Sequence, residues 1–117
     1  MSTLKVNTIE EATSGGATFY TTKAWVNFDG FGVVSIRADG NVSSITDNGV
    51  GIYTVAFTSA VTDANFAAYG GAGQDANDPI RDTGFFAVNT TTSLKTETFY
   101  GNNTAADAGL VMIAVTR

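Results

Sequence analysis

The side chains that could do chemistry in this chain are mainly carboxylates and hydroxyls. The 117 residues include eleven Asp and Glu, six Lys and Arg, no His and no Cys. General acid or base work near neutral pH most often uses imidazole, and thiolate nucleophiles or ligands need Cys. Serine triads, histidine-ligated metals and disulfides are therefore excluded within one chain. The composition predicts a protein that is not an enzyme.

A pair of carboxylates is the catalytic arrangement that this composition leaves open. Two such side chains at a suitable separation can cleave a glycosidic bond, which makes a glycan depolymerase a possible class. The eleven acids show no distinctive spacing, and most occupy expected turns, where Asp is favoured for backbone reasons. We therefore assign no catalytic, cofactor-binding or metal-binding residue.

The segment 74–78 places oxygen ligands at alternate positions, with Asp75 and Asn77 followed by Asp78. It lacks the glycine and the distal glutamate of an EF-hand loop, so a solvated loop held by local hydrogen bonds is expected. The glycines just before it have no lysine and no following helix, which excludes phosphate binding. The candidates for a ligand-contact loop are Tyr69, Asp75, Asn77, Asp78 and Tyr100.

Aromatic side chains are numerous, and two roles are open to them. From position 25 onward the chain holds Trp25, Phe28, Phe31, Tyr53, Phe57, Phe66, Tyr69, Phe85, Phe86, Phe99 and Tyr100. Core packing is the expectation for most of them, because large aromatic rings dominate cores. A sugar-stacking platform is the alternative, since the face of an aromatic ring suits the apolar face of a pyranose. Phe31, Tyr69 and Tyr100 lie nearest to expected turns and are the first to check for exposure.

The elements that must position these residues are short strands. In residues 51–58, Tyr53, Val55 and Phe57 share one face while Thr54 and Thr58 share the other, which is the period of a half-buried strand. Turn residues separate similar segments, a spacing typical of a sandwich or barrel. The fold class predicted is all-β, an antiparallel β-sandwich of about eight strands resembling a jelly roll, with strands near 23–29, 32–38, 41–46, 51–58, 65–71, 84–90, 94–100 and 110–116.

Turn chemistry predicts how the first strands connect. Asp29-Gly30, Asp39-Gly40 and the DNG run at 47–49 are candidate tight turns, because these residues tolerate positive φ. They predict a meander across residues 23–58 with successive strands paired. Residues 70–83 are expected to form the longest loop. The last segment, LVMIAVT, is apolar on both faces and is expected at the centre of a sheet or against a second subunit.

The chain divides into an arm, residues 1–22, and a β-sandwich domain, residues 23–117. The arm has few aromatic residues and ends near a flexible Ser-Gly-Gly run at 14–16. Leu4, Val6 and Ile9 give it apolar groups suited to attachment or oligomerisation, although a plain disordered terminus is the alternative. Extended structure is expected here. The opening residues lack the apolar core of a secretory signal.

The charge balance narrows the range of partners. The net charge is −5 and only 15% of residues are charged, whereas about a quarter is usual. Without clustered cations, nucleic acid and anionic membrane surfaces are unlikely partners, and no apolar run is long enough to span a bilayer. Burying a surface of hydroxyls and amides costs less desolvation free energy than burying a charged surface, so contact between copies is expected. The alternative is an ordinary extracellular β-protein, whose surface has the same composition.

Four segments carry a resemblance to a known group of proteins. In order they are MSTLKVNTI at 1–9, KAWVNF at 23–28, VSIRADGNVSSITDNG at 34–49 and YTVAFT at 53–58. They resemble a module of tail fibres and other virion appendages of marine bacteriophages of the cyanophage and pelagiphage type. The match covers about residues 1–9 and 23–60. Two departures are the apolar Val50 and Ile52 beside a turn, and the absence of a long fibre shaft.

The resemblance implies a non-enzymatic structural protein located in the virion, as a small fibre, tip or capsid-attached decoration domain. It also implies a homotrimer or other symmetric assembly, with other virion proteins as partners and a host-surface glycan as a further one. Within it, the arm with Leu4, Val6 and Ile9 would attach or oligomerise. A carbohydrate-binding module, acting alone or in host recognition, is the alternative function.

Overall fold

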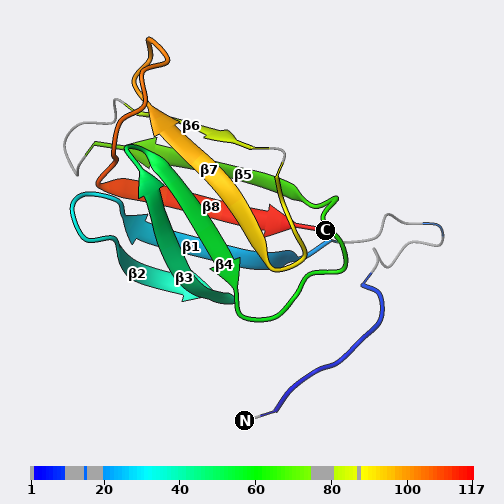
Figure 1. Cartoon of the computed structure of the whole chain (residues 1–117). Coiled ribbons are helices and arrows are strands. Elements are labelled where there is room, and N and C mark those ends of the chain that lie inside the picture. Colours follow the sequence, from blue (N-terminus) through cyan, green and yellow to red (C-terminus); the bar gives the residue numbers. More distant parts are fainter. Residues whose placement is uncertain (1, 10–14, 16–19, 75–80, 87) are drawn as a thin grey trace.

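The computed structural model describes residues 2–9, 15, 20–74, 81–86 and 88–117, and these residues form two packed sheets. The sheets have the strand orders β2-β1-β8-β5 and β3-β4-β7-β6, and all their pairings are antiparallel (Figure 1). The predicted eight-stranded β-sandwich is confirmed. The strands are β1 (Thr22–Asp29), β2 (Ser35–Gly40), β3 (Val42–Gly49), β4 (Ile52–Phe57), β5 (Ala67–Gly73), β6 (Asp82–Phe85), β7 (Ser93–Phe99) and β8 (Leu110–Thr116).

The core lies between the two sheets and follows the alternation of the strands. In β4 the buried positions are Tyr53, Val55 and Phe57, as the period-two pattern predicts. Facing side chains from the other sheet include Val26 and Phe28, and the ring of Phe28 meets that of Tyr53 edge-on with centroids 5.2 Å apart. Full burial of each such apolar side chain contributes about 1.5–3 kcal/mol.

Strand β8 lies at the centre of its sheet, between β1 and β5, as its apolar character predicts. Val111, Ile113 and Val115 point into the core, whereas Met112 is exposed on the outer face of the sheet. Because β8 has a partner along both edges, the side chains of three different strands share that outer face. This arrangement positions the candidate site.

The connection between β2 and β3 differs from the prediction. The hairpins β1–β2 and β3–β4 are present, but Asp39-Gly40 does not form a turn between paired strands, because β2 and β3 belong to different sheets. The chain crosses over at Asn41, which has φ 59°. The Asn41 side chain holds this corner: Nδ2 donates to the carbonyls of Lys23 and Ser59, both at 3.0 Å, and Oδ1 accepts from the Ser59 amide at 2.7 Å.

The predicted loop at 70–83 is also shorter than expected. Gly70–Gly73 continue β5 and pair with β8, so glycine here serves close strand approach: a Cβ on Gly70 would collide with the carbonyl oxygen of Met112. The next strand covers Asp82–Phe85 in place of the predicted 84–90, and Val88 beyond it is exposed. Among the described residues, no helix is long and apolar enough to cross a membrane.

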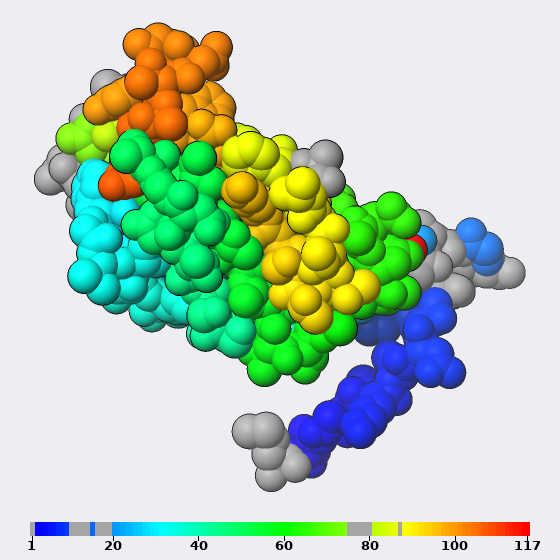
Figure 2. Space-filling model, in the orientation of Figure 1, coloured from blue at the N-terminus to red at the C-terminus, as the bar shows by residue number. Residues whose placement is uncertain are grey.

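Residues 2–9 run away from the sandwich, while the connection between β7 and β8 projects at the opposite end (Figure 2). Leu4 is 84% exposed, and Val6 and Ile9 are about half exposed. The segment Val6–Ile9 faces Tyr20 and Arg117 across a hollow of about 260 Å³. The described part of the arm therefore offers apolar side chains that its own sandwich does not bury.

Candidate functional site

The clearest hollow in the described part of the sandwich is a groove on the outer face of the β2-β1-β8-β5 sheet. Trp25 on β1, Ala114 on β8 and Tyr69 on β5 are direct neighbours in register across three strands. Adjacent strands are about 4.8 Å apart, so the backbones at Trp25 and Tyr69 are separated by roughly 10 Å. The two rings therefore lie on opposite sides of a trough that runs along β8. We call this trough the Trp25–Tyr69 groove.

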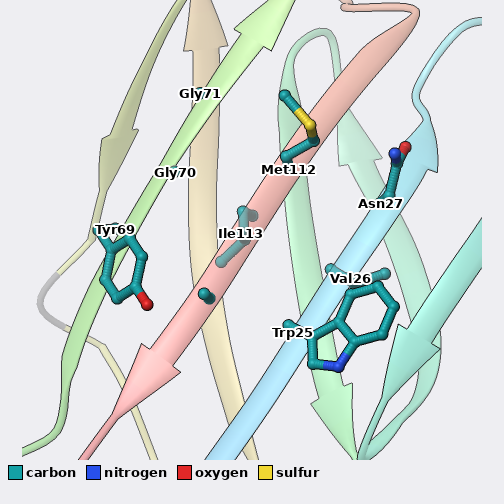
Figure 3. Close-up of a pocket in the computed structure, with 9 residues that line it drawn as sticks. Trp25, Val26, Asn27, Tyr69, Gly70, Gly71, Met112 and Ile113 are labelled. Carbon is teal, nitrogen blue, oxygen red and sulfur yellow. The ribbon is translucent and has the colours of Figure 1, made fainter. Parts of the chain in front are cut away.

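The floor of the groove is made by small and flexible side chains. The next row across the sheet is Asn27, Met112 and Gly71, again paired in register. The groove as a whole has a volume of about 310 Å³, which is at the lower end of the volumes of small-molecule sites. Figure 3 shows the indole of Trp25 and the ring of Tyr69 on either side of β8, with Met112 above them.

Both aromatic rings are open to solvent, Trp25 at 44% and Tyr69 at 55% of their surface. The place of the indole is set by Gly40 on β2, opposite Trp25: a Cβ at position 40 would collide with the indole Nε1. Trp25 therefore lies over the glycine and leaves the other side of its ring exposed. On the far side, Gly71 has no atom within 4 Å of where its Cβ would be. The groove is thus open because position 71 is glycine.

The polar groups at the groove are uncharged. The Asn27 Oδ1 accepts from Arg37 Nη1 at 3.4 Å, and Arg37 is itself held by the Gly109 carbonyl at 2.6 Å and by Asp29 at 3.6 Å. Within the described part of the chain, Asn27 Nδ2, the Tyr69 hydroxyl and Trp25 Nε1 make no hydrogen bond. No charged side chain lines the groove. It is an apolar surface bordered by two neutral groups that can donate a hydrogen bond, Asn27 Nδ2 and the Tyr69 hydroxyl.

The residues predicted for a ligand-contact loop are not gathered in one place. Tyr69 lines the groove, but Tyr100 does not; its ring lies 4.3 Å from the guanidinium carbon of Arg81, which stacks on it. Asp75, Asn77 and Asp78 fall outside the described residues. Phe31, Tyr69 and Tyr100, the rings nearest to the expected turns, are all exposed.

The expectation that most aromatic rings pack in the core is wrong. Of the eleven considered, those buried are Phe28, Tyr53, Phe57 and Phe66. Trp25 sits on an outward position of β1, next to the inward Ala24 and Val26, so alternation within KAWVNF was the signal that could have placed it. Nothing local in the sequence places Met112 and Tyr69 beside it, because that depends on the strand order.

A second polar cluster lies at the end of the sandwich and is structural. The Tyr53 hydroxyl is 3.0 Å from the Gly30 carbonyl and 3.2 Å from Asp107 Oδ1, which also accepts from the Gly51 amide at 2.8 Å. Burial, and then the charge of Asp107, raise the pKa of Tyr53 to about 12. Tyr53 has no exposed surface, so no substrate can reach it. Its role is to tie β4 to the loops at Gly30 and Asp107.

Acidic side chains are the remaining metal-ligating groups of the described residues. No group of three or more Asp, Glu, His or Cys there could hold a metal ion. The arm residues Leu4, Val6 and Ile9 are exposed and remain candidates for attachment. Comparison with protein-family models, with curated proteins and with solved structures found no match for this chain.

Proposed function

We propose that this chain is a non-enzymatic structural protein of a bacteriophage virion, as a small fibre, tip or capsid-attached decoration domain. Support comes from the resemblance of KAWVNF, VSSITDNG and YTVAFT to modules of marine phage appendages. In the fold these three runs lie in β1, which belongs to one sheet, and in β3 and β4, which form a hairpin in the other. The proposal places the chain in the extracellular particle, assembled in the host cytoplasm.

The observation that carries this proposal is how few charges the chain presents, since only 15% of its residues are charged. In the described residues the exposed large hydrophobic side chains are spread over the arm and both sheets, and only two ion pairs form. Such a surface is inexpensive to desolvate against another protein. A particle component has contacts of this kind on several sides, so uncharged exposed positions fit it better than they fit a free monomer.

The partners proposed are copies of the same chain, as a homotrimer, and other virion proteins. The arm supplies the contact, because Leu4, Val6 and Ile9 are apolar groups without cover in their own chain. Closed symmetric assemblies are the usual form of homo-oligomers.

The test of virion membership is direct. Particles of the phage that encodes this chain are purified on a density gradient, and their peptides are quantified by mass spectrometry. The proposal expects the chain in fixed ratio to the major capsid protein. A chain that is abundant in the lysate but missing from the purified particles would overturn it.

A carbohydrate-binding module is the second candidate, and one observation favours it. The Trp25–Tyr69 groove presents two exposed aromatic rings and neutral hydrogen-bonding groups on one open sheet face. Host-surface attachment by a virion protein would use the same property, so the two candidates are compatible.

A further inference from the structure

We propose that the Trp25–Tyr69 groove binds one uncharged pyranose ring of a polysaccharide, stacked on the indole of Trp25. The inference rests on the second of the two candidate functions and deepens it, because it assigns the site, the role of each residue and the class of sugar. It holds whether or not the chain belongs to a virion.

The shape of the groove fits a flat ring better than an extended apolar chain. The indole is held flat by its position over Gly40, and in Figure 3 its face is seen broadside. The axial C–H bonds of a pyranose carry slight positive charge and meet the negative face of an aromatic ring favourably. Tyr69, across β8, closes the other side of the trough at a separation that admits one ring.

The hydrogen-bonding groups at the edge complement sugar hydroxyls. Asn27 Nδ2 and the Tyr69 hydroxyl have no partner in the described part of the chain, and they border an apolar floor, whereas Trp25 Nε1 lies on the side of Gly40. Arg37 is bonded to the Asn27 oxygen, which leaves the amide nitrogen as the group available to a ligand. An apolar surface with a few fixed polar groups is the usual make-up of a small-molecule site. A purely apolar ligand would leave both groups unused.

The absence of charge selects the class of sugar. No residue lining the groove is a cation, and the chain carries a net charge of −5. The nearest cation, Arg37, is already bonded to Asn27, to the Gly109 carbonyl and to Asp29. A uronate or sulfated sugar would therefore lose the hydration of its anionic group without gaining an unengaged cation. Neutral hexopyranoses avoid this cost. We therefore expect neutral polysaccharides to bind and their acidic counterparts to bind more weakly.

A second copy of the chain fits the groove less well than a sugar does. The groove is concave, and its open volume depends on glycine at position 71, whereas the apolar side chains suited to assembly project from the arm as Leu4, Val6 and Ile9. The arm and the groove are separate surfaces, so assembly and sugar binding do not compete.

The experiment uses the intrinsic fluorescence of the protein, because Trp25 is its single tryptophan. The full chain is titrated with neutral tetrasaccharides of glucose, galactose and mannose, and with a galacturonate tetrasaccharide as the anionic probe. The expected result is a saturable change in Trp25 emission with at least one neutral probe and weaker binding of the anionic one.

Three variants locate the site. Gly71→Val adds a side chain at the groove where nothing lies within 4 Å of the added Cβ, and valine favours strands. It should weaken binding at least about tenfold, a change of roughly 1.4 kcal/mol, as should Tyr69→Ala. The matched control, Phe85→Ala, removes an exposed aromatic ring from the opposite sheet and should leave binding unchanged. Circular dichroism checks that each variant keeps its fold.

The possible outcomes distinguish a wrong assignment of the site from a wrong assignment of the carbohydrate-binding function. No emission change with any neutral probe, or tighter binding of the galacturonate, overturns the proposal. Binding that survives Gly71→Val supports a carbohydrate-binding module but overturns this site. If Gly71→Val instead dissociates an oligomer, the groove is a contact between copies and the proposal is also overturned.

Discussion

At the scale of single residues, Tyr53 connects strand β4 to several other parts of the fold. Its ring is fully buried against Phe28, and its hydroxyl reaches the Gly30 carbonyl and Asp107. The same burial raises its pKa to about 12 from the ordinary value of 10.0. The protonated hydroxyl is therefore part of the folded state.

The Tyr53→Phe variant should show both the cost of this hydroxyl and its pH dependence. Losing the bond to a buried carbonyl should cost about 1–3 kcal/mol in the free energy of unfolding near pH 7, measured in urea. Because the pKa is higher in the folded state, the stabilisation is complete below about pH 10 and is lost as the pH rises toward about 12. The variant should lack this part of the fall in the free energy of unfolding at alkaline pH. Equal stability and an equal pH profile for the two proteins would contradict the assignment.

Two glycines provide a matched pair for a second prediction. Gly51 has φ 69°, and a Cβ there would collide with the carbonyl oxygens of Thr98 and Ala106, whereas Gly71 faces open space. Gly51→Ala should lower the free energy of unfolding by at least about 2 kcal/mol. Gly71→Ala should leave it unchanged or raise it by up to about 1 kcal/mol. Thermal denaturation of both variants checks this, and similar effects at the two sites would be inconsistent with the structure.

At the scale of elements, the corner at Asn41 decides which strands share a sheet. Its side chain makes three hydrogen bonds that join the end of β2 to Lys23, near the start of β1, and to Ser59, just after β4. The Asn41→Ala variant should lose about 2–4 kcal/mol, from these bonds and from the positive φ. Asn41→Gly should lose less, since glycine accepts that φ. Urea unfolding of the two variants distinguishes them; a larger loss for Asn41→Gly would refute this account of the corner.

Sequence reasoning located the strands because alternation is local. The alternation in residues 51–58 predicted β4 to within one residue at each end. The segment LVMIAVT, which is apolar on both faces, predicted a central strand. It failed at Asp39-Gly40, because residues that tolerate positive φ serve a hairpin or a crossover between sheets equally well. It also read Gly70–Gly73 as loop, since glycine that serves close strand packing resembles glycine in a turn.

The candidate site was less predictable than the strands that carry it. Tyr69 was named from its place near an expected turn, but its neighbours in the groove come from β1 and β8, about 45 residues away on either side. Strand order joins them, and strand order is not contained in periodicity. Trp25 could be recognised as an aromatic residue in the sequence, whereas its exposure followed from knowing that its sheet has an uncovered face.

At the scale of the whole molecule, two surfaces have different chemistry. The arm offers aliphatic side chains in an extended segment, and the groove offers aromatic rings with neutral polar groups. This separation is compatible with both proposals, assembly through the arm and ligand binding on the sheet face.

The arm prediction is tested by replacing Leu4, Val6 and Ile9 with serine together in the full chain. Removing the apolar groups should weaken self-association at least about tenfold, while the thermal unfolding of the sandwich changes little, because these side chains lie outside its core. Sedimentation velocity reports the association. An assembly as tight as that of the unmodified chain would mean that the arm does not form the contact.

The most direct test of the central claim, that this chain is an assembling structural domain, is the mass of the full protein in solution by light scattering. The chain mass is 12.1 kDa, so a homotrimer should measure about 36 kDa, stable on dilution into the low micromolar range. A measured mass of 12.1 kDa at every protein concentration, which is the mass of a monomer, would contradict the claim.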